Sequence, residues 1–334
     1  MSARKRDKVL AWSVPMLSEV GALMRSILMA WAAGPEELGR AMMLVLVLRL
    51  TEMISDIGVE RLLMTSRDGD DPDFMAALQG AAMLRGFAMA LMLLVLAVPM
   101  SMSFSGGASL PTYLALAIIP LLRAFLNLDY RKSERNFRYG PMAIVEGGSV
   151  IVMLVSLPIL THLVPDHRAM LLALIVQAAA QVVLSHLVAK RRWRMKIDPV
   201  VLHRAFRFGA PLVVNAFPMC LTFQADRMIV AGWFGWAEVG LYGVALQLAS
   251  LPAQIAGRAA GSLLAPRLRV AMHEDNLHAV MRSAMKLHLA LAGAFALGFA
   301  LLAPFAIEMV YGADFRPSFA LALALGLAAA FRIL

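Results

Sequence analysis

The sequence Gly235-Trp-Ala-Glu-Val-Gly240 lies between two long apolar runs, and Gly34-Pro-Glu-Glu-Leu-Gly39 lies between two similar runs earlier in the chain. Both stretches follow the pattern Gly-Xaa-Xaa-Glu-Xaa-Gly, whose glycines suit a tight turn. Each stretch predicts a pair of apolar helices joined by that turn. The residues from Pro111 to Ala117 also match those from Pro317 to Leu323. We therefore predict an internal repeat whose two copies have the same orientation in a membrane.

The composition is that of an integral membrane protein. Of 334 residues, 60% are hydrophobic and 16% are charged, whereas soluble domains average about 45–50% and 25%. Apolar runs of about 18 to 25 residues recur, and each can cross a hydrocarbon core of roughly 30 Å as a helix. We predict an all-α membrane fold with about ten spans, over residues 9–33, 38–62, 77–101, 110–128, 140–163, 169–189, 208–234, 239–263, 287–311 and 317–334.

The positive charge is distributed according to membrane topology. The net charge is +9, and Lys and Arg gather in alternate connections between the predicted spans. By the positive-inside rule, those connections and the N-terminus are cytoplasmic, so we expect no nucleic-acid partner. We predict an N-terminal six-helix bundle over 1–190, a basic cytoplasmic linker over 191–207, and a C-terminal bundle over 208–334. This bundle holds four of an expected six helices, so we expect it to be incomplete.

Several charged residues fall inside the predicted spans. They are Glu19, Arg25, Arg49, Glu52, Asp56, Arg85, Arg123, Glu146, Asp226, Arg227, Arg258 and Glu308. Each costs roughly 2.5–3.5 kcal/mol near the bilayer centre, so most cannot face lipid. Either they pair with one another inside the bundle, or they line a water-filled cavity. Those near predicted helix ends, Arg123, Arg258 and Glu308, are expected to extend toward the membrane surface instead.

The second predicted span carries a polar stripe. Arg49, Glu52 and Asp56 are spaced i, i+3 and i+7, which places them on one face of a helix. Glu19 and Arg25 serve the first span in the same way. A polar stripe on an apolar helix is what a cavity wall requires, although a structural salt bridge explains any single residue equally well.

The residues 28–39, Phe208-Gly-Ala-Pro211 and the stretch from Asp226 to Gly235 resemble the Wzx-type polysaccharide flippases. These belong to the multidrug/oligosaccharidyl-lipid/polysaccharide exporter superfamily. The resemblance implies two helical bundles around a cavity that opens alternately to each side of the bacterial inner membrane. It implies movement of a polyprenyl-pyrophosphate-linked oligosaccharide to the periplasmic leaflet during surface polysaccharide biosynthesis. It implies no enzymatic activity, cofactor or metal, and as partners membrane lipids and the polymerase and glycosyltransferases of the pathway.

On this interpretation the charged residues divide into two groups. The expected substrate-binding residues are Arg25, Arg49 and Arg227 for the pyrophosphate, with Gln247 and Gln254 for sugar hydroxyls. The expected gating or ion-coupling residues are Glu19, Glu52, Asp56 and Asp226.

Two other functions are compatible with the sequence. One is an ion-coupled exporter of small molecules from the same superfamily. The other is a membrane glycosyltransferase or ligase, which is disfavoured because its acidic catalytic groups need a sizeable outside loop and the loops predicted outside are short.

Overall fold

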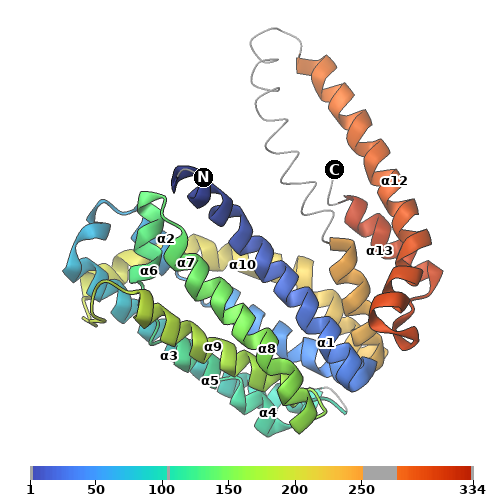
Figure 1. Cartoon of the computed structure of the whole chain (residues 1–334), viewed down its shortest axis with the longest axis horizontal. Coiled ribbons are helices and arrows are strands. Elements are labelled where there is room, and N and C mark those ends of the chain that lie inside the picture. The colour runs from blue at the N-terminus through green and yellow to red at the C-terminus, as the bar shows by residue number, and fades with distance from the viewer. Residues whose placement is uncertain (1–2, 104–105, 251–276, 332–334) are drawn as a thin grey trace. The chain divides into compact units, whose positions relative to one another are not determined.

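The computed structural model describes residues 3–103, 106–250 and 277–331, and every regular element in these ranges is a helix (Figure 1). Five of the described helices are long and apolar enough to cross a membrane: Pro72–Ser103, Gly140–Leu163, Arg168–Val188, Pro199–Trp233 and Met281–Tyr311. Two shorter apolar helical stretches occupy Leu110–Arg123 and Phe319–Phe331. The predicted all-α membrane fold is therefore confirmed.

The predicted turns fall where the backbone needs glycine. Helix α1 (Ala3–Ile54) is interrupted at Gly34, whose φ of 75° is unfavourable for other residues. Pro35 follows directly, and its fixed φ suits the first turn of the second half of α1. Gly235 has a φ of 102° and separates α10 (Pro199–Trp233) from a helix over residues 236–250. Both motifs therefore join two helices, as predicted.

The second half of α1 is shorter than predicted. It ends at Ile54, and a non-helical segment that includes Gly58 (φ 68°) precedes α2 (Val59–Thr65). The Gly58 N–H donates to Asp56 Oδ1 at 3.0 Å, a local bond that competes with helix formation. The expectation that Asp56 continues the helical stripe of Arg49 and Glu52 was therefore wrong, because Asp56 lies beyond the helix end.

The α-helices between α2 and α10 are α3 (Pro72–Ser103), α4 (Leu110–Ala115), α5 (Ile118–Arg123), α6 (Asp129–Lys132), α7 (Gly140–Met142), α8 (Gly148–Leu163) and α9 (Arg168–Val188). The predicted span over 110–128 is thus divided between α4 and α5. Pro120 has no N–H to donate to the carbonyl of Leu116, which weakens the helix at this join. A π-helical turn over Ala143–Gly147 connects α7 with α8.

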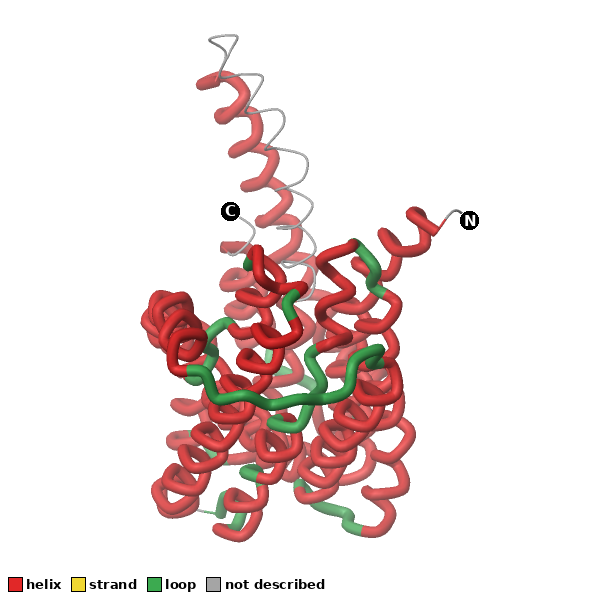
Figure 2. Tube along the Cα trace, turned by 90° about the vertical axis from the view of Figure 1, so that its left-hand side faces the viewer, coloured by secondary structure: helices red, strands yellow, loops and turns green. Residues whose placement is uncertain are grey.

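Residues Met1–Trp236 form one compact unit. In it α1 packs against α8, α3, α9 and α10, and α8 lies along α9 (Figure 1). Helix α10 approaches the end of α1 closely, since a Cβ at Gly209 would overlap the backbone of Ile57. The connection 189–198, between α9 and α10, lies at the left of Figure 1, the side that faces the viewer in Figure 2.

Residues Ala237–Leu334 form a second unit, in which α12 (Leu277–Tyr311) packs against α13 (Phe319–Phe331). Gly326 allows close contact, because a Cβ there would lie 2.9 Å from the carbonyl oxygen of Ala296. The predicted division into pseudo-symmetric bundles at residues 191–207 rests on the sequence repeat, and it stays a prediction.

Candidate functional site

An inner cavity of about 160 Å³ lies within the first unit, between the two halves of α1 and helices α5, α8 and α9. Three residues predicted for the site line it together: Arg25, Arg49 and Glu52. Gln177 and Gln181 of α9 add neutral hydrogen-bonding groups to the wall. Arg123 and Glu146 line it as well, so the structure combines three cations, two carboxylates and two amides in one small space.

The two inner arginines have no carboxylate partner among the described residues. Arg25 Nη1 lies 3.9 Å from the sulfur of Met153, which is a weak acceptor. In the part of the chain that the structure describes, neither Arg25 nor Arg49 forms an ion pair with an acidic side chain. The lining holds three arginines and two glutamates, so positive charge is in excess in this cavity and favours an anionic ligand.

A larger outer cavity of about 480 Å³ lies between the end of α1, α2, α3 and α5. Charged side chains line it, among them Glu52, Asp56, Arg85 and Arg123. Arg85 Nη1 lies 3.8 Å from Asp56 Oδ1, so these two charges partly neutralise each other. Cations and carboxylates therefore occur as pairs in the outer cavity, whereas Arg25 and Arg49 of the inner cavity form no ion pair with a carboxylate among the described residues.

Glu52 and Arg123 line both cavities and form an ion pair with each other. Arg123 Nε also donates to Gln181 Oε1 at 3.0 Å, which fixes the guanidinium between α1 and α9. The expectation that Arg123 extends toward the membrane surface was wrong. Because α5 ends at Arg123, the side chain starts at a helix end, yet it turns into the bundle toward Glu52.

Most other predicted site residues lie away from these cavities. Glu19 on α1 and Asp226 and Arg227 on α10 are partly buried, and none of them lines either cavity. Gln247 is partly buried in the helix over residues 236–250, which belongs mainly to the second unit. Gln254 lies outside the described residues.

Of the other residues expected near helix ends, Arg258 also lies outside the described residues. Glu308, near the end of α12, forms an ion pair with Arg316 at 3.0 Å.

Sequence reasoning did not place Arg85, Arg123 or Glu146 among the site residues, although it noted their charge. It missed Gln177 and Gln181 altogether. Their i, i+4 spacing puts both amides on one face of an otherwise apolar helix, and this signal could have identified them.

An ionic network adjoins the inner cavity. Arg131 of α6 forms ion pairs with Glu60 at 3.0 Å, Glu134 at 3.1 Å and Glu146 at 2.6 Å. Burial raises the pKa of Glu134, and the charge of Arg131 only partly offsets that effect. Since Glu146 also lines the inner cavity, the network connects the cavity to the surface segments around α6.

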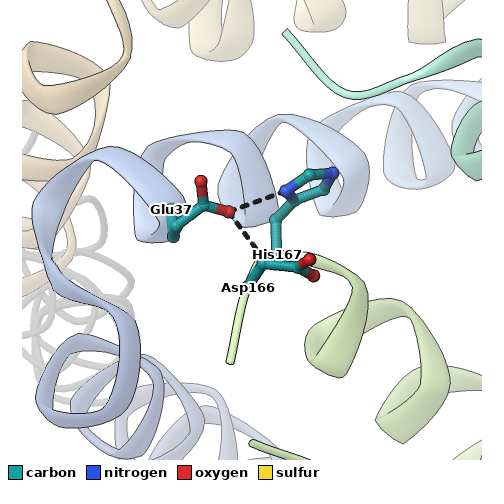
Figure 3. A group of neighbouring side chains, drawn as sticks. All are labelled: Glu37, Asp166 and His167. Atoms are coloured by element: carbon teal, nitrogen blue, oxygen red, sulfur yellow. Dashed lines mark hydrogen bonds and ion pairs between the residues drawn. The ribbon is translucent and has the colours of Figure 1, made fainter. Parts of the chain in front are cut away.

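A second polar cluster joins the Gly34–Gly39 turn to the start of α9 (Figure 3). Glu37 Oε2 accepts a hydrogen bond from the backbone N–H of His167 at 2.8 Å. The same oxygen lies 2.7 Å from Nδ1 of the His167 ring. Asp166 is close enough to share a metal ion with both residues. However, Arg168 already pairs with Asp166 and Arg40 with Glu37, so the arrangement fits a hydrogen-bonded clamp better than a metal site.

Comparison with known proteins identifies the family of this chain. A search of curated proteins found no match. The model of a family described as "Polysaccharide biosynthesis protein" matches residues 28–320, which include both cavities' charged residues except Arg25. That match covers most of the chain and confirms the family resemblance seen in the sequence. The chain belongs to the polysaccharide biosynthesis protein family.

Proposed function

We propose that this chain moves a polyprenyl-pyrophosphate-linked oligosaccharide from the cytoplasmic to the periplasmic leaflet of the bacterial inner membrane. The transport serves the biosynthesis of a surface polysaccharide, such as O-antigen, exopolysaccharide or capsule. One observation carries the proposal: Arg25 and Arg49 line one cavity inside a helical bundle, and neither forms an ion pair with a carboxylate among the described residues. Leaving cations unpaired there is costly unless an anion neutralises them.

A lipid-linked sugar matches the chemistry of the first unit. Its polyprenyl tail is soluble in hydrocarbon, whereas its pyrophosphate and sugars need a polar path. Guanidinium groups bind phosphate oxygens through paired hydrogen bonds. The amides of Gln177 and Gln181 can meet phosphate oxygens or sugar hydroxyls at the same wall.

The sizes of the two cavities suggest how substrate enters. The inner cavity, at about 160 Å³, is too small for an oligosaccharide, since sites for drug-sized ligands need roughly 300–1,000 Å³. The outer cavity, at about 480 Å³, falls within that range. We infer that the sugar occupies the outer space while the pyrophosphate approaches Arg25 and Arg49, and that the Glu52–Arg123 pair must open for this to happen.

The remaining sequence assignments stay part of the proposal. Arg227, Gln247 and Gln254 are proposed to contact substrate in other states of an alternating-access cycle. Glu19, Asp56 and Asp226 are proposed to gate the cavity or couple it to an ion. The proposed partners are the membrane lipids and the polymerase and glycosyltransferases that act on the same lipid-linked sugar, and the protein itself is proposed to catalyse no reaction.

Ion-coupled export of a small molecule is the second candidate. The carboxylates of Glu52 and Asp56 favour it, because they line the outer cavity where a proton or cation could compete with Arg123 or Arg85. The inner arginines favour the lipid-linked substrate, because a cationic drug would be repelled by them.

The test is complementation of a strain that lacks this gene. We expect Arg25→Gln/Arg49→Gln to abolish surface polysaccharide display, with normal protein levels in the membrane and accumulation of lipid-linked precursor on the cytoplasmic side. The matched control, Arg67→Gln/Arg138→Gln, removes two exposed arginines outside both cavities and should restore display. Full display by the Arg25/Arg49 variant would contradict the proposal. Efflux of a small molecule without lipid-linked sugar would favour the second candidate.

A further inference from the structure

The connection over residues 189–198 has no regular structure, yet it is firmly attached to the first unit. The backbone N–H of Lys196 donates to the carbonyl of Ala76 on α3 at 3.0 Å. The backbone N–H of Lys190 donates to Asp129 Oδ2 at 2.8 Å, and Asn127 Nδ2 donates to the carbonyl of Arg191 at 3.1 Å. Gly80 lets the connection lie directly on α3, since a Cβ there would overlap the carbonyl of Lys196. These contacts hold the intervening side chains in place.

Beneath the connection lies a third cavity of about 350 Å³. One wall is apolar and consists of Pro72, Met75 and Ala76 at the start of α3. The opposite wall is basic and includes Arg192 and Arg194. A cavity with one apolar and one cationic wall suits an amphiphile that carries an anionic group.

Two exposed arginines and one buried indole N–H at this cavity have no protein acceptor among the described residues. Arg192 and Arg194 form no ion pair or hydrogen bond with the residues that the structure describes, in contrast to Arg191, which donates to the carbonyl of Asp70 at 3.2 Å. Between them, the indole Nε1 of Trp193 is buried and lacks an acceptor in the same described ranges. The buried indole N–H is costly without a partner, whereas water solvates the two exposed guanidinium groups, which are therefore accessible to an anionic ligand.

The residues around this cavity are of the kinds expected at a membrane surface. The rings of Trp193 and Phe125 are 6.3 Å apart, and Phe125 is 44% exposed. Leu187, in the last turn of α9, is 74% exposed. Exposed apolar groups beside tryptophan and arginine are typical of the boundary between acyl chains and headgroups. Free inorganic phosphate would gain nothing from the apolar wall.

We propose that this cavity binds the headgroup of an anionic phospholipid, with its phosphate between Arg192, Trp193 and Arg194 and its glycerol and first acyl carbons against Pro72 and Met75. The site is separate from the two transport cavities, and the proposal does not depend on the proposed function. A bound lipid would fasten the connection between α9 and α10 to the membrane surface.

The test measures lipid binding by the full chain in detergent micelles, with native mass spectrometry and dioctanoyl phosphatidylglycerol as the probe. We expect saturable binding of the phosphatidylglycerol and much weaker binding of dioctanoyl phosphatidylcholine. Arg192→Gln/Arg194→Gln should weaken binding roughly tenfold or more, because each cation near the surface contributes substantially. Trp193→Phe keeps the ring but removes the donor, and it should weaken binding by a smaller factor.

The control is Arg67→Gln/Arg138→Gln, which removes the same charge from exposed positions on neighbouring cytoplasmic segments. It should bind phosphatidylglycerol as the wild type does, within about twofold. Equal losses in both double variants would show non-specific attraction and overturn the proposal, as would unchanged binding by Arg192→Gln/Arg194→Gln. Displacement of the lipid by inorganic phosphate at equal concentration would also overturn it, since the site would then recognise a free anion.

Discussion

Arg123 at the end of α5 and Glu52 in the second half of α1 form an ion pair that borders both the inner and the outer cavity. Their side chains are 28% and 31% exposed, so water reaches the pair without fully screening it. Gln181 holds Arg123 from the side of α9. Three elements distant in sequence therefore meet at one charged contact, and under the proposed function this is the contact that must open.

The first prediction concerns the strength of this pair. Arg123→Gln leaves the carboxylate of Glu52 without its cation, and it should destabilise the protein by roughly 1–2 kcal/mol. Glu52→Gln should cost less, because Gln181 still accepts from Arg123. The double variant should be more stable than the sum of the single losses predicts, with a coupling of roughly 0.5–2 kcal/mol. Thermal unfolding midpoints of the purified variants in detergent provide the measurement, and additive losses would show that the pair contributes nothing.

The membrane fold could be predicted from the sequence because short stretches of sequence determine its spans and turns: apolar runs form the long helices, and glycines allow the turns between them. The long apolar runs became α3, α8, α9, α10 and α12, and the two repeated motifs became turns at Gly34 and Gly235. The break at Asp56–Gly58 could not be predicted, because it depends on the Asp56 side chain capturing a backbone N–H and on α10 packing closely there. Hydrophobicity across Ile57 and Val59 concealed it.

The candidate site could be predicted only in part. Arg25, Arg49 and Glu52 could be identified because they are charged residues inside predicted apolar spans, and a bilayer tolerates such residues only inside a helical bundle. The sequence could not identify which charges pair, because Glu52 and Arg123 are far apart in sequence and the pairing depends on how α5 packs against α1. Position near a helix end was a misleading guide for Arg123, whose side chain is long enough to turn inward.

The second prediction tests the close contact between α10 and the end of α1. Gly209→Ala places a Cβ against the backbone of Ile57, which cannot move as a side-chain tip could. We expect a loss of roughly 1–3 kcal/mol in stability from this overpacking. Gly232→Ala on the same helix has open space around it, and it should be neutral or slightly stabilising. Equal unfolding midpoints for the two variants would contradict the packing seen here.

The third prediction concerns pH and the clamp between Glu37 and His167 (Figure 3). Burial raises the pKa of Glu37, but the hydrogen bonds from His167 and the charge of Arg40 outweigh it and hold that pKa below its ordinary value. Glu37 therefore stabilises the fold above the pKa of an unfolded glutamate, about 4.3. This contribution is lost as the pH falls through the lower folded pKa.

The comparison that isolates this effect is between pH 5.5 and pH 3. The wild type should lose more thermal stability on acidification than Glu37→Gln, which lacks the contribution at both pH values. Glu36→Gln removes the neighbouring carboxylate, which is 59% exposed, and it should respond to acid as the wild type does. An equal response of all three proteins would show that the clamp is not charged in the folded state.

The fourth prediction separates charge from geometry at Arg25 and Arg49. Lysine keeps the positive charge but lacks the planar fork that binds two phosphate oxygens at once. If these residues serve only to make the cavity electropositive, Arg25→Lys/Arg49→Lys should export polysaccharide as the wild type does. If they bind the pyrophosphate through paired hydrogen bonds, the lysine variant should export polysaccharide roughly three- to tenfold more slowly. The glutamine variant should then export none. The rate at which surface polysaccharide reappears after enzymatic removal distinguishes the two outcomes. We expect the intermediate rate, because Arg25 and Arg49 form no ion pair among the described residues and line one small cavity with the amides of Gln177 and Gln181.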